Sequence, residues 1–270
     1  MDTVKYHLSQ DTVKLGGVAM EVLSTGIPTL DDALGGGLIE DSNLLIVYDT
    51  YSKGWAVAFE VLRNRIKEGD FGVIIDSVLP VSALEMELGA INFNLSSEGN
   101  AGNLAVVDVF SSFYGLEYVS NFVYTDKNID AGTFLPKYER LYRRILEEKI
   151  GKRRPIGLDV TMDGLAFLFG EENFISIFQR IMAMKERARI TEERKRPVNI
   201  FLLNRGRASE RLVAWTSLYS QYVIDFSSPN APFEETMIVR KSPLPEFNPL
   251  KSRYRFRLVN GKVELTPVPL

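Results

Sequence analysis

The chain has 270 residues, of which 45% are hydrophobic and 25% are charged, and its formal net charge is −3. This composition is typical of a globular protein with one large core. The absence of cysteine excludes disulfides and thiol chemistry, and the single histidine, His7, excludes a histidine triad within one chain.

We expect neither membrane contact nor export from the sequence. No segment has the nearly uninterrupted run of about 20 apolar residues that a membrane span needs. The N-terminal stretch lacks the apolar core of a signal peptide, so a cytoplasmic location is expected. Scarce glutamine and plentiful Glu, Lys and Arg, together with absent cysteine, are typical of a thermophile.

Apolar runs rich in β-branched residues alternate with helical patterns as far as Phe226. This alternation predicts an α/β protein with a parallel sheet and crossover helices. The expected strands span 44–47, 71–75, 104–109, 156–159, 198–203 and 222–226. The expected helices span 55–67, 81–88, 134–148 and 172–189.

The pattern changes after Phe226. Residues 237–240 and 254–265 alternate like antiparallel strands, and Asn260-Gly261 is a strong hairpin turn. The proline-rich stretch 242–249 predicts a surface loop.

Residues 43–62 have the outline of a phosphate-binding P-loop, with an apolar strand, a short polar turn and an amphipathic helix. A P-loop reads G-x-x-x-x-G-K-[ST], and its glycines let backbone N–H groups surround the phosphates. Here the three glycine-type positions are Tyr48, Tyr51 and Lys53. The Lys-Ser/Thr pair is replaced by Gly54-Trp55. The last Gly-Lys is therefore inverted.

The inversion changes the chemistry of the loop. One residue of shift at a helix start rotates a side chain by about 100°, so Lys53 points away from a bound phosphate. Trp55 has no hydroxyl for a magnesium ion, and a tyrosine at positive φ costs about 1–2 kcal/mol. We expect no nucleotide binding and no conventional NTPase activity from the loop residues Tyr48, Tyr51, Ser52, Lys53, Gly54 and Trp55.

Two nearby side chains have alternative roles. Trp55 either fills the vacated phosphate site as an apolar plug or packs between the helix and the sheet. Asp49 is expected to cap the N-terminus of the following helix. Gly35-Gly36-Gly37 is expected to form a tight turn rather than a phosphate loop.

The segment Ser24-Thr-Gly-Ile-Pro-Thr-Leu-Asp-Asp-Ala-Leu-Gly-Gly-Gly-Leu-Ile-Glu-Asp41 resembles the signature that precedes the P-loop in RecA-superfamily ATPases of the KaiC and RadA type. Later segments follow the order of that family, because 73–77, 156–159 and 201–204 resemble its second, Walker B and sensor strands. The resemblance implies a RecA-like P-loop NTPase fold. That fold is a twisted, mostly parallel sheet with helices on both faces and a C-terminal antiparallel hairpin extension. It implies one domain over residues 22–270, with residues 1–21 as an N-terminal arm or small appended element.

The departures from this family concern nucleotide handling. The position of the catalytic glutamate carries Asp76 or Ser77, and general-base geometry tolerates little misplacement. The Walker B aspartate is Asp159, with Asp163 as an alternative register. Members of this family often carry a basic pair on a C-terminal strand. Arg240-Lys241 preserves at most half of that pattern.

Asp159 and Asp163 could hold a metal or cap the next helix. A lone carboxylate binds Mg²⁺ weakly without substrate phosphates, so Asp76 and Asp159 are interpreted as vestigial. We therefore expect no metal, no cofactor and no catalytic residues.

A basic group follows the sensor strand, where RecA-type recombinases carry a DNA-binding loop. It consists of Arg205, Arg207 and Arg211, near the basic helix end 185–196. An overall charge of −3 argues against strong nonspecific DNA binding, although a local patch could bind nucleic acid.

An aromatic-rich stretch offers a different surface. Phe110, Phe113, Tyr114, Tyr118, Phe122 and Tyr124 could cover the core or form an exposed partner site, because aromatic residues are enriched at interfaces.

The leading hypothesis is a non-catalytic RecA/KaiC-like protein, a pseudo-ATPase that acts through protein–protein contact. It could pair with an active relative or self-associate as a dimer or ring. The second hypothesis is an accessory protein of repair or recombination that binds DNA or RNA. The third is a weak ATP-binding ATPase that recruits Lys53 and Asp76 in a rebuilt loop.

Overall fold

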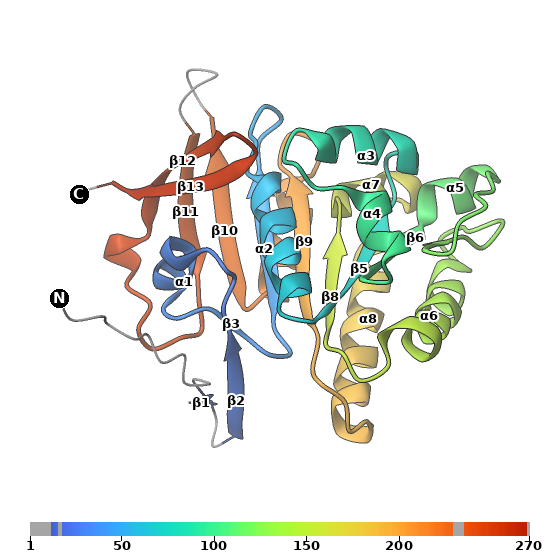
Figure 1. Cartoon of the computed structure of the whole chain (residues 1–270), viewed down its shortest axis with the longest axis horizontal. Coiled ribbons are helices and arrows are strands. Elements are labelled where there is room, and N and C mark those ends of the chain that lie inside the picture. Colours follow the sequence, from blue (N-terminus) through green and yellow to red (C-terminus); the bar gives the residue numbers. More distant parts are fainter. Residues whose placement is uncertain (1–11, 16–17, 229–234, 269–270) are drawn as a thin grey trace.

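The computed structural model describes residues 12–15, 18–228 and 235–268. Within these residues a ten-stranded sheet runs through the molecule in the order β13-β12-β11-β10-β4-β9-β8-β5-β6-β7 (Figure 1). Its seven parallel strands are β4 (Asn43–Tyr48), β5 (Phe71–Asp76), β6 (Leu104–Asp108), β7 (Val123–Tyr124), β8 (Pro155–Asp159), β9 (Val198–Asn204) and β10 (Tyr222–Ser227). The antiparallel extension consists of β11 (Glu235–Lys241), β12 (Arg253–Val259) and β13 (Lys262–Pro267).

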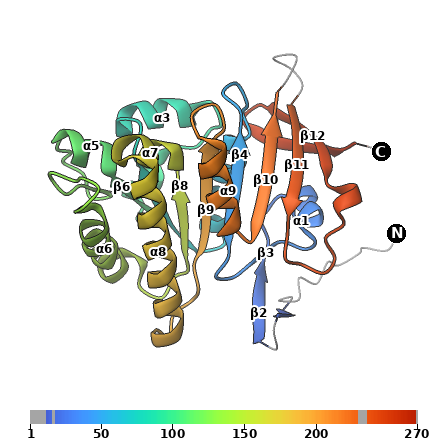
Figure 2. The same cartoon turned by 180° about the vertical axis from the view of Figure 1, so that it is seen from behind.

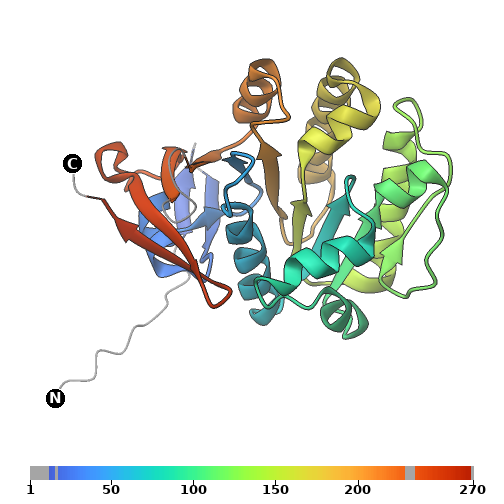
Figure 3. The same cartoon turned by 90° about the horizontal axis from the view of Figure 1, so that it is seen from above.

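Helices cover both faces of the sheet, as the views from the front, behind and above show (Figures 1, 2 and 3). One face carries α1 (Pro28–Leu34), α2 (Trp55–Lys67), α3 (Val81–Gly89) and α4 (Leu95–Asn100). The other face carries α5 (Val109–Tyr114), α6 (Phe134–Ile145), α7 (Met162–Phe169), α8 (Glu171–Thr191) and α9 (Glu210–Leu218). The parallel strands are therefore buried on both sides, which explains their continuous apolar runs.

A second, three-stranded antiparallel sheet joins β1 (Thr12–Leu15), β2 (Val18–Leu23) and β3 (Leu38–Ile39). The boundary expected after residue 21 falls inside β2, and residues 1–11 lie outside the described residues, His7 among them. Arg154, only 2% exposed, ties this sheet to the start of β8 through ion pairs with Glu21 and Glu40.

The strands and helices expected from the sequence are confirmed, with end shifts of a few residues. Val109 is a correction, because it begins α5 instead of ending β6. The Asp108 carboxylate accepts the N–H of Ser111 at 2.7 Å, and this N-cap turns the chain into a helix. Helix α6 ends at Ile145 and continues as a π-helical turn, Leu146–Ile150.

Candidate functional site

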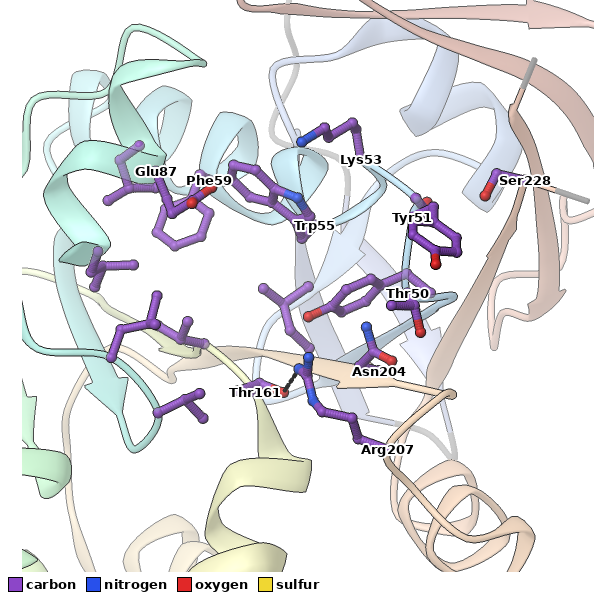
Figure 4. A pocket seen from close by; sticks show the side chains of 18 of the residues that line it. Thr50, Tyr51, Lys53, Trp55, Phe59, Glu87, Thr161, Asn204, Arg207 and Ser228 are labelled. Atoms are coloured by element: carbon purple, nitrogen blue, oxygen red, sulfur yellow. Dashed lines mark hydrogen bonds between the residues drawn. The ribbon is translucent and has the colours of Figure 1, made fainter. Parts of the chain in front are cut away.

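A cavity of about 960 Å³ lies at the carboxyl ends of the parallel strands (Figure 4). The chain leaves β4 for β5, and β9 and β8 later fill the gap between them. Ligands of open α/β sheets bind in the crevice where the strand order changes in this way. The cavity is lined by Tyr48, Thr50, Tyr51, Ser52, Lys53, Trp55, Phe59, Val78, Leu79, Leu84, Glu87, Leu88, Val160, Thr161, Leu202, Asn204, Arg207, Ser228 and Glu235.

One side of the cavity is apolar. Trp55 and Phe59 of α2 meet edge to face with ring centroids 6.0 Å apart, and Leu84 and Leu88 of α3 also line the cavity. Trp55 thus packs against the core while it lines the cavity, and the cavity remains open beside it.

The loop between β4 and α2 uses its backbone N–H groups internally. The Asp49 carboxylate accepts the N–H groups of Tyr51 and Ser52 at 3.1 and 2.9 Å, and it also accepts both the N–H and the hydroxyl of Ser228. Burial acts to raise the pKa of Asp49, but the bonds from Ser228, Tyr51 and Ser52 lower it, so the group stays ionised. The prediction that Asp49 caps α2 is wrong. Asp49 holds the loop, and the N-cap of α2 is Gly54.

Glu235 of β11 completes this arrangement. Its carboxylate accepts the Lys53 N–H at 2.9 Å and the Ser52 hydroxyl at 2.5 Å. The Gly54 N–H in turn donates to the Ser52 hydroxyl oxygen at 2.9 Å. A protein carboxylate therefore occupies the N-terminal end of α2, where the helix dipole and free N–H groups favour an anion.

Gly54 is required by close packing rather than by its backbone angles. Its φ of −55° suits any residue, but a Cβ there would lie 2.3 Å from the ring of Phe226 on β10. The side chain of Lys53 is exposed and points over the cavity mouth (Figure 4).

The other side of the cavity is polar. Strand register places Tyr48 of β4 beside Asn204 of β9. Beyond them the Arg207 guanidinium donates to the buried Asp163 carboxylate at 2.5 Å and to the Thr161 hydroxyl at 3.3 Å. Burial raises the pKa of the Tyr48 hydroxyl, so it stays protonated and keeps its donor.

Comparisons with known proteins identify the fold. No protein-family model matches the chain, and no curated protein is significantly similar to it. The structure is similar to the uncharacterized protein PH0321 of Pyrococcus horikoshii, solved in complex with an unknown peptide. That match has a TM-score of 0.76 at 19% identity and covers 91% of this chain and 99% of PH0321. It is also similar to the KaiC-like protein PH0186 of the same organism, with a TM-score of 0.66 at 17% identity, over 92% and 100% of the two chains.

The fold is RecA-like, of the KaiC type. It matches the fold that the segment Ser24–Asp41 implies. No helix of the described residues is long and apolar enough to cross a membrane.

The acids interpreted as vestigial lie beside the cavity but not in its wall. Asp159 pairs in register with Phe201, so it faces the side of the sheet opposite the cavity, and Val160 lines the cavity instead. The Asp76 carboxylate accepts the N–H groups of Val78 and Leu79, which holds a turn. The alternative that Asp159 or Asp163 caps the next helix is wrong, because the N-cap of α7 is Thr161 without a side-chain bond.

Burial raises the pKa of both Asp159 and Asp76. Burial, with repulsion from Asp163 and Asp76, raises the pKa of Asp159 to about 8. Burial also raises the pKa of Asp76 to about 6, with repulsion from Asp108 as a smaller cause. Among the described residues no group of three His, Cys, Asp or Glu side chains is placed to hold a metal ion.

The three arginines after β9 do not form a free basic patch. Arg205 pairs with Asp225 at 3.0 Å, Arg207 pairs with Asp163, and Arg211 pairs with Glu172. Arg240 shares Asp225 at 3.3 Å. Each of the three arginines that could contact nucleic acid is thus paired with a neighbouring carboxylate.

The aromatic-rich stretch has side chains both in the core and on the surface. Phe122 and Tyr124 are buried, whereas Phe113, Tyr114 and Tyr118 are exposed. Sequence reasoning missed Glu235 and Asn204 as cavity residues. The Asn204 signal was its place at the end of the sensor-like strand, but Glu235 lies 182 residues from Lys53 and no local pattern connects them.

Proposed function

We propose that this protein is a non-catalytic RecA/KaiC-like protein, a pseudo-ATPase that acts through protein–protein contact. The observation that carries the proposal is that the backbone N–H groups of the loop before α2 already have acceptors within the protein. The N–H groups of residues 51–54 that would surround a phosphate already donate to Asp49, Glu235 and Ser52. A nucleotide would have to displace these acceptors and bring its phosphates beside two carboxylates.

Magnesium chemistry is equally poorly supported at this site. Trp55 stands where a P-loop supplies a hydroxyl ligand, and the strand ends present Val78, Leu79 and Val160 to the cavity. Mg²⁺ prefers oxygen ligands and usually shares them with substrate phosphates. In this proposal the described residues around the cavity therefore offer ATP hydrolysis neither an anion site nor a metal site.

Two observations support protein contact as the alternative use of the scaffold. The cavity is open, and one side is formed by aromatic and aliphatic side chains, which suit apolar groups of a partner. The structural neighbour PH0321 is described in complex with an unknown peptide. The partner in our proposal is a second copy, in a dimer or ring, or another protein such as an active RecA/KaiC-like relative.

Calorimetry with ATP and ADP in the presence of Mg²⁺, on protein whose mass in solution is measured in the same sample, tests the proposal. We expect no binding up to millimolar nucleotide. Saturable binding with magnesium-dependent turnover that Asp159→Ala abolishes would overturn the proposal and favour the rebuilt-loop ATPase.

Salt-dependent binding to single-stranded DNA would instead favour the nucleic-acid hypothesis, provided that Arg207→Ala and Arg211→Ala remove it. The carboxylate partners of these arginines lead us to expect no such binding.

A further inference from the structure

The cavity has two chemically different sides that face each other across one opening. Trp55 and Phe59 lie on one side, and Asn204 and Arg207 lie on the other, at the ends of β9 and its loop (Figure 4). A ligand that satisfies both must carry an apolar group and a hydrogen-bond acceptor.

Asn204 provides an unused donor that is aimed at the cavity. Its side chain is 2% exposed, and its Oδ1 accepts the Gly206 N–H at 2.9 Å, which assigns the other atom as the amide nitrogen. Nδ2 has no hydrogen-bond partner among the described residues, although it lines the cavity (Figure 4). This nitrogen is not among the fully buried unpartnered atoms of the described residues, so it is open to the cavity and can donate to an acceptor on a ligand.

Arg207 adds a second donor beside Asn204. Its Nε and one terminal nitrogen are engaged by Asp163 and Thr161, while the side chain is 49% exposed. The Tyr48 hydroxyl also interacts with the guanidinium, and since the group has five N–H donors against these three partners, it keeps a donor for the cavity that it lines. The buried Asp163 carboxylate balances the charge of Arg207, so the guanidinium offers N–H donors with little net charge.

The charges of the cavity disfavour a polyanion. Its lining carries two cations, Lys53 and Arg207, and two carboxylates, Glu87 and Glu235. Asp163 behind Arg207 makes the surroundings more negative, so a triphosphate or phosphoryl group would be repelled. A main-chain carbonyl oxygen is a neutral acceptor that suits the two donors without this repulsion.

We propose that the cavity binds an extended, uncharged apolar segment of a partner protein. Its main-chain carbonyls accept hydrogen bonds from Asn204 and Arg207, and its apolar side chains pack against Trp55, Phe59, Leu84 and Leu88. This inference rests on the proposed function, since it requires the cavity to be free of nucleotide, and it names the chemistry of the partner.

Nuclear magnetic resonance of the two tryptophan indole N–H signals tests the inference. Trp55 lines the cavity, whereas Trp215 packs on Tyr219 at the other face of the sheet and serves as the internal control. The probes are the capped dipeptide acetyl-Leu-Phe-amide, the free acid acetyl-Leu-Phe and Mg-ATP. We expect acetyl-Leu-Phe-amide to shift the Trp55 signal saturably and to leave the Trp215 signal in place.

A variant separates the hydrogen bond from the apolar contact. Asn204→Asp keeps the acceptor for Gly206 but replaces the free donor by a carboxylate oxygen, so the dipeptide amide should bind at least tenfold more weakly. The control is Arg211→Ala, because the Arg211 guanidinium pairs with Glu172 outside the cavity lining. This variant should bind the dipeptide amide as the natural protein does.

The outcomes distinguish the two proposals. Absence of any Trp55 shift with the dipeptide amide, or tighter binding of the free acid, would overturn the inference and leave the pseudo-ATPase proposal intact. Saturable binding of Mg-ATP at Trp55 would overturn the pseudo-ATPase proposal and the inference with it. Equal binding by Asn204→Asp would overturn the donor role of Asn204.

Discussion

The loop before α2 and the ends of β9 and its loop border the same cavity, but their hydrogen-bond donors are used differently. The N–H groups of residues 51–54 donate to Asp49, Ser52 and the distant Glu235. The Asn204 amide nitrogen, in contrast, lacks a partner among the described residues. In RecA-like ATPases the first region is the one that must stay open for phosphate.

In the proposed function, this difference would let the same scaffold bind a different kind of ligand. Glu235 accepts the Lys53 amide, and Asp49 and Ser52 accept the other three, so the loop is stabilised from within the chain. The unused donors lie instead beside an apolar wall, which suits a ligand of lower charge. Four experiments test these different uses of the donors.

The largest expected effect is on the pH dependence of stability, through the buried acids Asp159 and Asp76. Asp159, with its pKa raised to about 8, keeps its proton in the folded state up to that pH, while the unfolded chain loses it near pH 4. Unfolding therefore releases a proton between these values, and stability falls as the pH rises from about 4 to about 8. Asp76, at about 6, adds to this fall only below pH 6 or so.

Asp159→Asn should remove most of the loss between pH 6 and pH 8, which we expect to be about 2 kcal/mol in the natural protein. Urea unfolding at the two pH values measures it. If the free energy of unfolding falls equally with pH in the variant and in the natural protein, Asp159 is ionised in the folded state.

Gly54→Ala tests whether the loop is held against the C-terminal strands. The new Cβ would meet the ring of Phe226 at 2.3 Å, and such overpacking should cost about 2 kcal/mol. Gly89→Ala is the matched control, because a Cβ there meets nothing within 4 Å. If both variants unfold at the same urea concentration, the close contact of the loop with β10 would be refuted.

Glu235→Ala tests whether a protein carboxylate replaces phosphate. Loss of its bonds to Ser52 and Lys53 should cost about 1 kcal/mol, and the vacated site should accept inorganic phosphate. Thermal unfolding should then shift upward with phosphate in the variant but not in the natural protein. Glu264→Ala, at an exposed position of β13, should gain no such response, and a variant at residue 235 that ignores phosphate would contradict the idea.

Arg211→Ala should have the smallest effect. Its pair with Glu172 is solvent-exposed, and such pairs contribute about 0–1 kcal/mol. Fluorescence anisotropy with single-stranded DNA at low salt should show no binding by the natural protein or the variant. Binding that this variant weakens would restore the nucleic-acid hypothesis.

Local patterns in the sequence were enough for most of the fold. Strands such as Phe71–Asp76 and helices such as Trp55–Lys67 follow from apolar runs and helical spacing, which depend on near neighbours. The short helix α5 was not predicted, because its first residue, Val109, continues the apolar run of the strand before it. Only the structure shows that Asp108 caps a helix there through the Ser111 N–H.

By itself the sequence determined the alternating α/β order, the signature before the loop and the absence of P-loop glycines, since each is read within a few consecutive residues. Only the tertiary structure decided which groups surround the cavity. Strand order brings Glu235 to the Lys53 N–H across 182 residues, and the pleat turns Asp159 away while Val160 faces inward. Such contacts depend on which strands become neighbours and in which register, and this is fixed by packing of the whole chain.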